Sequence, residues 1–280
     1  MAKTFDSLFA SPFYLSCAFP LKQAVIMKRY ADYQHASISM SKDTDFIAAV
    51  NDAFRQYPIQ HVIECGTFLG TGSTVVLAEA IKDTGRLSSL RSFYTLEVDY
   101  YFFRQAKKNL KRYPFIKPVW GMSVTKKEAL AFIQNDEVLK NHQAIEDVFI
   151  DDVNDPVSFY TNEVNGNLSN TSSWERKKAV KKFGWQKPFF FFREGFLARK
   201  IPEIKNEFPL FLLDSAGGIG WLEFQKVVQL MGSHAYVMIL DDTHHIKHFR
   251  SLRYIQQNQH FTILASNQQH GWAIAHYKPQ

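Results

Sequence analysis

The chain has 280 residues, of which 46% are hydrophobic and 21% charged, and its formal net charge at pH 7 is +6. A chain of this length can bury roughly 75% of its unfolded surface, and the composition excludes disordered and fibrous proteins. No uninterrupted apolar stretch reaches the ~18 residues that a membrane-spanning helix needs, so we expect no membrane partner.

Residues 1–43 are expected to form an N-terminal segment, followed by one main domain over residues 44–280. Near the start, Asp6 and two prolines break up an apolar stretch, which argues against a signal peptide. The two cysteines, Cys17 and Cys65, are too few for a disulfide framework. We therefore expect a reducing, cytoplasmic location.

From residue 43 onward, short apolar stretches alternate with helical patterns. The expected strands are 61–65, 92–99, 116–121, 208–214, 235–242, 261–266 and 271–277, and the expected helices are 43–57, 73–81, 100–113, 221–231 and 245–257. Continuously apolar strands separated by helices predict an α/β fold with a parallel sheet covered on both faces. The last two strands have no helix between them and predict a hairpin.

About 85 residues separate the third expected strand from the fourth, far more than one crossover requires. Residues 125–134 are expected to supply the crossover helix, which leaves an insertion over about residues 136–205. Within it, residues 175–200 carry nine basic and two acidic side chains and a run of four phenylalanines. This stretch is either a solvated basic helix followed by core phenylalanines or a surface that grips nucleic acid.

Residues 62–75, VIECGTFLGTGSTV, place three glycines between the first strand and its helix. A phosphate-binding P-loop would need a lysine before Ser73, and the dinucleotide fingerprint would need a glycine at Val75, so both motifs fail. The stretch fits the pattern Glu-x-Gly-x3-Gly-x-Gly, formed by Glu64, Gly66, Gly70 and Gly72. Such a glycine turn brings backbone N–H groups close to a ligand.

This pattern resembles the first motif of the class I S-adenosylmethionine (SAM) dependent methyltransferases. The resemblance implies a Rossmann-like, doubly wound and mostly parallel seven-stranded sheet of order 3-2-1-4-5-7-6, with SAM as cofactor. In that family an acid after the second strand, here Glu97, binds the ribose hydroxyls, and a Gly-x-Ser after the third strand lies near the adenine. The cofactor-binding residues implied are Glu64, Gly66, Thr67, Gly70, Gly72, Ser73, Glu97, Gly121, Ser123 and Asp214.

Acidic residues end the fourth and fifth expected strands: Asp214 after one, and Asp241 and Asp242 after the other. Adjacent parallel strands would bring these carboxylates together, where they repel one another unless a positive group lies between them. A hard divalent cation such as Mg²⁺ suits such oxygen ligands. The arrangement resembles the metal-dependent O-methyltransferases of the catechol type and of the macrolide- and aminocoumarin-sugar type. The alternative is that the aspartates cap the following helices.

The same resemblance bears on the catalytic base. Catechol-type enzymes carry a lysine three residues beyond the first metal-binding aspartate, where this chain has Gly217. Some sugar-methylating relatives have a histidine two residues after the acidic pair, and His244 matches it, with His245 in reserve. A histidine near neutral pKa can accept a hydroxyl proton, although a histidine here can equally be an ordinary surface residue.

The sequence thus predicts a methyltransferase that moves a methyl group from SAM to a hydroxyl of a small molecule or sugar, assisted by Mg²⁺ or another divalent cation. One alternative is a nucleic-acid-directed methyltransferase that uses the basic, aromatic insertion. Another is a SAM-binding module without turnover. The sequence does not fix the oligomeric state and leaves a homo-oligomer open.

Overall fold

The computed structural model describes residues 40–145, 147–165, 192–216 and 218–279. Most of the predicted N-terminal segment, and residues 166–191 of the predicted insertion with most of its basic and aromatic side chains, lie outside the described residues. None of the described helices has the length and apolarity to cross a bilayer.

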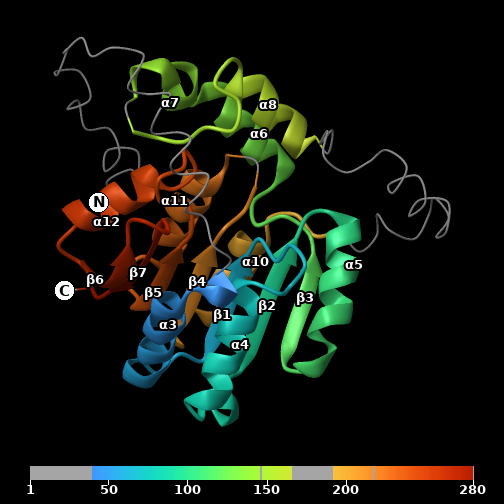
Figure 1. Cartoon of the computed structure of the whole chain (residues 1–280), viewed down its shortest axis with the longest axis vertical. Coiled ribbons are helices and arrows are strands. Elements are labelled where there is room, and N and C mark those ends of the chain that lie inside the picture. The colour runs from blue at the N-terminus through green and yellow to red at the C-terminus, as the bar shows by residue number, and fades with distance from the viewer. Residues whose placement is uncertain (1–39, 146, 166–191, 217, 280) are drawn as a thin grey trace, which may run out of the picture.

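Seven strands form one sheet in the order β3-β2-β1-β4-β5-β7-β6 (Figure 1). They are β1 (His61–Cys65), β2 (Ser92–Glu97), β3 (Ile116–Trp120), β4 (Pro209–Leu213), β5 (Tyr236–Leu240), β6 (Phe261–Asn267) and β7 (Trp272–Tyr277). The first five are parallel, and β7 pairs antiparallel with β5 and β6. The predicted Rossmann-like fold and strand order are confirmed.

Helices cover both faces of the sheet. The described α-helices are α3 (Thr44–Gln56), α4 (Ser73–Asp83), α5 (Tyr100–Asn109), α6 (Lys126–Asn135), α7 (Glu137–Lys140), α8 (Pro156–Val164), α10 (Phe196–Ile204), α11 (Gly220–Met231) and α12 (Phe249–Gln257), and the described 3₁₀ helices are η1 (Met40–Lys42), η2 (Arg86–Ser88), η3 (Leu110–Arg112) and η4 (His142–Ala144). One core cluster joins α3, α4 and α5 to the sheet, and a second joins α10, α11 and α12 to the opposite face. This is a doubly wound arrangement.

The connection between β3 and β4 differs from the prediction. We expected residues 125–134 to form the crossover helix, but α6 packs with α7 and α8 in a third cluster above the sheet, called the cap here (Figure 1). The helix that lies on the sheet before β4 is α10, whose Leu197 and Ile201 are fully buried against it. The prediction that residues 125–134 form the crossover helix is therefore wrong, because the apolar face of α6 packs within the cap.

The strand register brings the carboxyl ends of four strands, β1, β2, β4 and β5, together. Cys65 of β1 pairs with Leu96 of β2 and Leu213 of β4, and Leu213 pairs with Leu240 of β5. Because these strands are parallel and in register, the residues that follow them meet at one edge of the sheet. The cap covers that edge (Figure 1).

Candidate active site

The turn after β1 needs glycine for a close approach of three chain segments. Gly66 has a φ of +98°, and a Cβ there would overlap the backbone carbonyl of Asp214. The backbone N–H groups of Gly66 and Thr67 both donate to the carbonyl of Leu96, at 3.1 and 3.0 Å. The turn is thus fastened to the ends of β2 and β4, which is why a side chain is excluded at this position.

Glu64 lies beneath this turn, fully buried. Its carboxylate accepts hydrogen bonds from the hydroxyls of Ser73, Thr74 and Thr95, at 2.6, 2.7 and 2.6 Å. Burial raises the pKa of Glu64 to about 7, against the lowering effect of these donors. Glu64 and Ser73 therefore tie the start of α4 to the sheet, and their contact with a cofactor stays a prediction.

A cavity of about 390 Å³ opens beside the turn, a size suited to a small-molecule ligand. Of the predicted cofactor residues, those that line it are Gly66, Glu97, Gly121, Ser123 and Asp214. Those that do not are Glu64, Thr67, Gly70, Gly72 and Ser73. Half of the predicted cofactor-binding residues therefore line the cavity, and the other half lie in or next to the turn after β1.

Glu97 lies at the end of β2, almost fully buried. Its two carboxylate oxygens accept the backbone N–H of Phe68, at 2.7 Å, and of Asp99, at 2.8 Å. Burial raises the pKa of Glu97 to about 7. Phe68 has a positive φ of 50° and packs on Phe102, with ring centroids 4.5 Å apart, so two aromatic rings stand at the cavity beside the carboxylate.

Two further lining residues, Ser123 and Ser215, are held by a residue of α11. The carboxylate of Glu223 is fully buried and accepts hydrogen bonds from the hydroxyl of Ser123 and, at 2.7 Å, from that of Ser215. Burial raises the pKa of Glu223 to about 7. Glu223 thereby connects the segment after β3 with the segment after β4.

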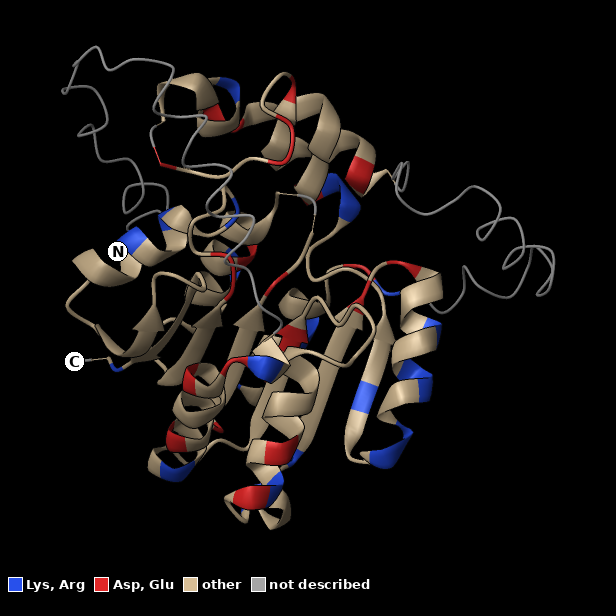
Figure 2. Ribbon diagram, viewed as in Figure 1, with Lys and Arg blue, Asp and Glu red and all other residues tan. Residues whose placement is uncertain are grey.

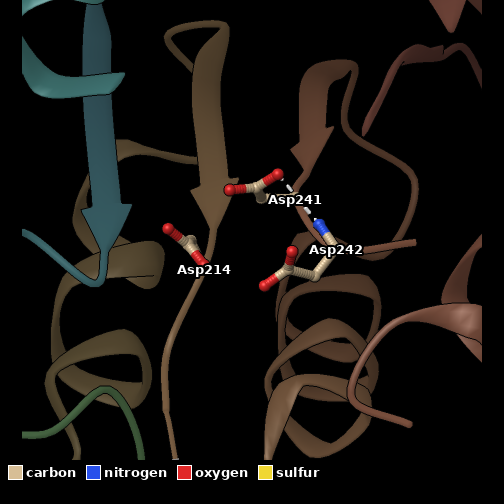
Figure 3. Close-up of side chains that lie close together, drawn as sticks. All are labelled: Asp214, Asp241 and Asp242. Carbon is tan, nitrogen blue, oxygen red and sulfur yellow. Dashed lines mark hydrogen bonds between the residues drawn. The ribbon is translucent and has the colours of Figure 1, made fainter. Parts of the chain in front are cut away.

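The three predicted acidic residues do come together. Asp214, Asp241 and Asp242 each offer a carboxylate oxygen that lies within 4.8 Å of the others, and Figure 3 shows the three side chains facing a common space. The Oδ1 of Asp241 accepts the backbone N–H of Asp242 at 2.9 Å. Burial and the charges of its two neighbours raise the pKa of Asp241 well above its usual range.

A lysine that the sequence analysis did not single out lies in this cluster. The Nζ of Lys247 is 2.8 Å from Oδ1 of Asp214 and 2.7 Å from Oδ2 of Asp242. Its charge, ahead of the effect of burial, holds the pKa of Asp242 below the usual range, whereas burial raises that of Asp214. The mutual repulsion expected of three carboxylates is therefore relieved by an ammonium group of the chain itself.

The predicted divalent cation fits this cluster only in part. Three carboxylates are suitable ligands for a hard cation. However, the Lys247 ammonium already contacts Asp214 and Asp242, and it would repel a metal ion held by the same groups. The residues present do not fit a metal ion unless Lys247 moves away.

A second cavity of about 240 Å³ lies next to the first, between the cap and the sheet edge. The two cavities share Glu163, Ala216 and Lys247 in their linings. His245 lines the smaller one, and its Nε2 is 3.0 Å from Oδ2 of Asp151. Its Nδ1 accepts the backbone N–H of Lys247 at 3.2 Å, so the hydrogen bonds place the ring hydrogen on Nε2.

The two predicted bases are thus placed differently. The Nε2 of His244 faces the backbone carbonyl of Gln268 in the turn between β6 and β7, and His244 lines neither cavity. His245 lines a cavity, but both of its ring nitrogens are already engaged. A base role for either histidine stays a prediction that these placements do not favour.

Neither a family model nor a curated protein matches the chain. An O-methyltransferase from Bacillus cereus, in complex with SAH, is 13% identical, covers 95% of this chain and 96% of its own, and gives a TM-score of 0.43. TomG from Streptomyces achromogenes, an O-methyltransferase involved in tomaymycin synthesis and bound to SAM, is 11% identical, with 98% and 95% covered and a TM-score of 0.40. An rRNA methylase from Streptococcus thermophilus is 10% identical, with 85% and 98% covered and a TM-score of 0.38. At such low similarity, the function of this chain has to be inferred from its own side chains.

Two residues of the site, Lys247 and Glu223, were not found from the sequence. Lys247 stands five residues after Asp242, inside a run of histidines that drew attention to the imidazoles instead. Glu223 is an acid on the buried face of α11, beside Phe224 and Val227, and that position was the available signal, because acids are buried only with partners.

Proposed function

We propose that this chain is a SAM-dependent methyltransferase that acts on a hydroxyl group of a small molecule or sugar. The observation that carries the proposal is the cavity at the sheet edge, where the turn at Gly66, the Glu97 carboxylate and Ser123 meet beside the Asp214 cluster. Carboxylate oxygens accept hydrogen bonds from both hydroxyls of a ribose. Gly66 lines the cavity with main chain alone, beside the end of β4.

The smaller cavity is the proposed acceptor site. It is lined by the carboxylates of Asp151, Glu163 and Asp242, which suit a ligand rich in hydroxyl groups. SAM supplies a sulfonium methyl group: the acceptor oxygen forms the new O–C bond as the S–C bond breaks, which leaves S-adenosylhomocysteine (SAH). The hydroxyl proton passes to one of the carboxylates that line this cavity, those of Asp151, Glu163 and Asp242. The chain contributes mainly the positioning of the two reactants.

Metal assistance, predicted from the sequence, stays a prediction. If a divalent cation binds, Asp214, Asp241 and Asp242 are the residues that would hold it, and it would lower the pKa of the acceptor hydroxyl. The Lys247 ammonium, in contact with Asp214 and Asp242, would repel such a cation.

Titration calorimetry with SAH at pH 8 tests cofactor binding. We expect saturable binding by the wild type and a loss of about tenfold or more in affinity for Glu97→Gln, since hydrogen bonds to a charged group contribute about 1.5–3 kcal/mol. Glu203→Gln removes an exposed carboxylate on α10 and should bind like the wild type. A wild type that does not take up SAH would rule out the proposed function.

A second candidate function, action on nucleic acid, is favoured by one surface. A groove of about 970 Å³ runs between α5 and the edge strand β3. Its described lining includes five cations and no acid: Arg104, Lys107, Lys108, Lys111 and Arg193. Figure 2 shows basic residues along α5. Tyr100 and Trp120 also line the groove, with ring centroids 4.8 Å apart, and could stack on bases.

Salt-dependent binding of a 20-nucleotide poly(U) RNA decides between the candidates. An RNA-directed enzyme should bind it with an affinity that falls steeply with salt, and the combined Lys107→Ala, Lys108→Ala and Lys111→Ala variant should flatten that slope. A control variant that lacks the exposed Lys82, Lys127 and Lys278 carries the same net charge. Equal binding by both variants, or none by the wild type, would leave the small-molecule acceptor.

The remaining alternative is a SAM-binding module without turnover. A wild type that binds SAH and methylates none of the candidate acceptors would favour it. Asp241→Ala alters the acid cluster without touching the glycine turn, so if the wild type transfers methyl groups and this variant does so equally well, the acid cluster has no part in the chemistry.

A further inference from the structure

Lys247 stands out because a flexible, strongly hydrated side chain is buried at a cluster of acids. It lies in the segment between β5 and α12, and its side chain is only 8% exposed. Buried lysines are rare unless they are paired. Here the pairing is double, with Nζ contacting Asp214 of one strand end and Asp242 of the next.

The surroundings of Lys247 hold it in this position. Its backbone N–H donates to Nδ1 of His245, and a Cβ on Gly220 would lie 2.8 Å from its carbonyl oxygen, so α11 packs directly against this part of the chain. Burial acts to lower the pKa of the ammonium, but Asp214 and Asp242 raise it well above its usual range. The positive charge is thus a fixed part of the cluster.

The ammonium also faces both cavities. An ammonium group has three N–H donors. Within the described residues two of them are directed at Asp214 and Asp242, which leaves one for a ligand. Because Lys247 is common to the linings of the larger and the smaller cavity, that donor can reach an oxygen atom at their junction.

We propose that the Lys247 ammonium is the resident cation of the Asp214, Asp241 and Asp242 cluster, so that the protein binds no divalent metal there. In the proposed methyl transfer, on which this second part rests, the ammonium donates to the acceptor oxygen and stabilises the negative charge that develops there as the hydroxyl proton leaves. It does so in the place where a metal ion would otherwise act.

Binding of Mn²⁺, followed by electron paramagnetic resonance, tests the first part without any acceptor. We expect no saturable binding by the wild type at concentrations up to about 1 mM, which corresponds to about −4 kcal/mol. Lys247→Met removes the charge and keeps the length, and it should gain at least about tenfold in Mn²⁺ affinity. Adding Asp214→Asn to Lys247→Met should abolish that gain.

Two further variants serve as controls for charge and for the loss of a lysine elsewhere. Lys247→Arg retains the charge and should stay without Mn²⁺, and Lys226→Met removes a partly buried lysine that pairs with Glu128, away from the cluster. Mn²⁺ should raise the melting temperature of Lys247→Met and not that of the wild type. If Lys247→Met does not fold, the wild type and Asp214→Asn still decide whether the cluster binds a divalent metal.

Stoichiometric Mn²⁺ binding by the wild type that Asp214→Asn abolishes would overturn the proposal. So would a folded Lys247→Met that gains no Mn²⁺ affinity, because the lysine would then not occupy a cation site. SAH titration of the same samples separates this outcome from the proposed function. Failure to bind SAH removes the methyltransferase assignment but leaves the resident ammonium untouched.

Discussion

At Gly66 the main chain turns at a φ of +98° and lies directly against the carbonyl of Asp214. Few other positions in the described chain combine a left-handed backbone with so close a neighbour. Gly72, six residues later in the same turn, has open space around it and a φ of −97°. A side chain is therefore excluded at Gly66 but has room at Gly72, although the sequence motif has a glycine at both positions.

Gly66→Ala should destabilise the protein by about 2 kcal/mol or more, because a Cβ is strained at this φ and collides with backbone that cannot move independently. Gly72→Ala should change the free energy of unfolding by less than about 1 kcal/mol. Urea denaturation of both variants measures the difference. Equal losses would mean that the close approach at Gly66 does not determine its identity.

Glu223 gives a pH-dependent prediction. Burial raises its pKa from 4.5 to about 7, against the lowering effect of the hydrogen bonds from Ser123 and Ser215. Between these two pH values the unfolded chain has released the proton and the folded chain still holds it, so stability falls as pH rises through this window.

Glu223→Gln keeps the shape of the protonated side chain and removes its titration. Its free energy of unfolding should match that of the wild type near pH 4.5 and exceed it above pH 7. Denaturation midpoints across this range provide the measurement. A constant difference between the two proteins would contradict the raised pKa.

One side chain at the start of α3 forms hydrogen bonds with both the helix and the final hairpin. Asp43 caps the helix by accepting the backbone N–H groups of Asp45 and Phe46, and its Oδ2 is also 2.7 Å from Nδ1 of His270 and 2.8 Å from Nε1 of Trp272. A single carboxylate therefore joins the first described helix to β7 and the turn before it.

Asp43→Ala should cost about 2–4 kcal/mol, since a helix cap contributes about 0.5–2 kcal/mol and a buried N–H left unpaired about 1–3 kcal/mol. Asp52→Ala, on the same helix, breaks an exposed pair with Arg55 and should cost less than about 0.5 kcal/mol. Thermal or urea denaturation distinguishes them. A loss for Asp43→Ala as small as that for Asp52→Ala would show that the hairpin is held without it.

The elements that periodicity and turn residues specify locally were predictable. They are every strand of the sheet and the flanking helices α3, α4, α5, α11 and α12. The helix α10 was not, because Pro202 stands inside it and the sequence around it is basic and rich in phenylalanine. Nor could spacing reveal Lys247 as the partner of Asp214, since that contact depends on how two loops fold toward each other. The acid cluster itself was predictable, because parallel strands in register end at the same edge.

A buried ion pair joins the cap to the sheet domain. Arg250 of α12 donates from Nη1 and Nη2 to both carboxylate oxygens of Asp136, at 2.9 and 2.5 Å, and both side chains are less than a tenth exposed. Phe149 of the cap also forms an isolated β-bridge with His245. The cap is therefore packed against the sheet domain beside the candidate site.

Arg250→Met should cost about 3–5 kcal/mol, because it leaves the Asp136 carboxylate buried without its partner. Hydrogen exchange should then accelerate over residues 126–165 more than in the sheet. Lys140→Met, which breaks an exposed pair with Glu137 in the cap, serves as the control and should change little. Uniform acceleration across the sheet and cap would mean that the pair stabilises the fold as one unit.

The wall that the two cavities have in common, made of Glu163, Ala216 and Lys247, makes their ligands thermodynamically interdependent. Whatever fills one space alters the groups presented to the other, and linkage requires the effect to be reciprocal. A first ligand that strengthens the binding of the second by some factor is itself held more tightly by that same factor. Order of addition would then be a kinetic property of this protein, while the stability of the ternary complex would not depend on it.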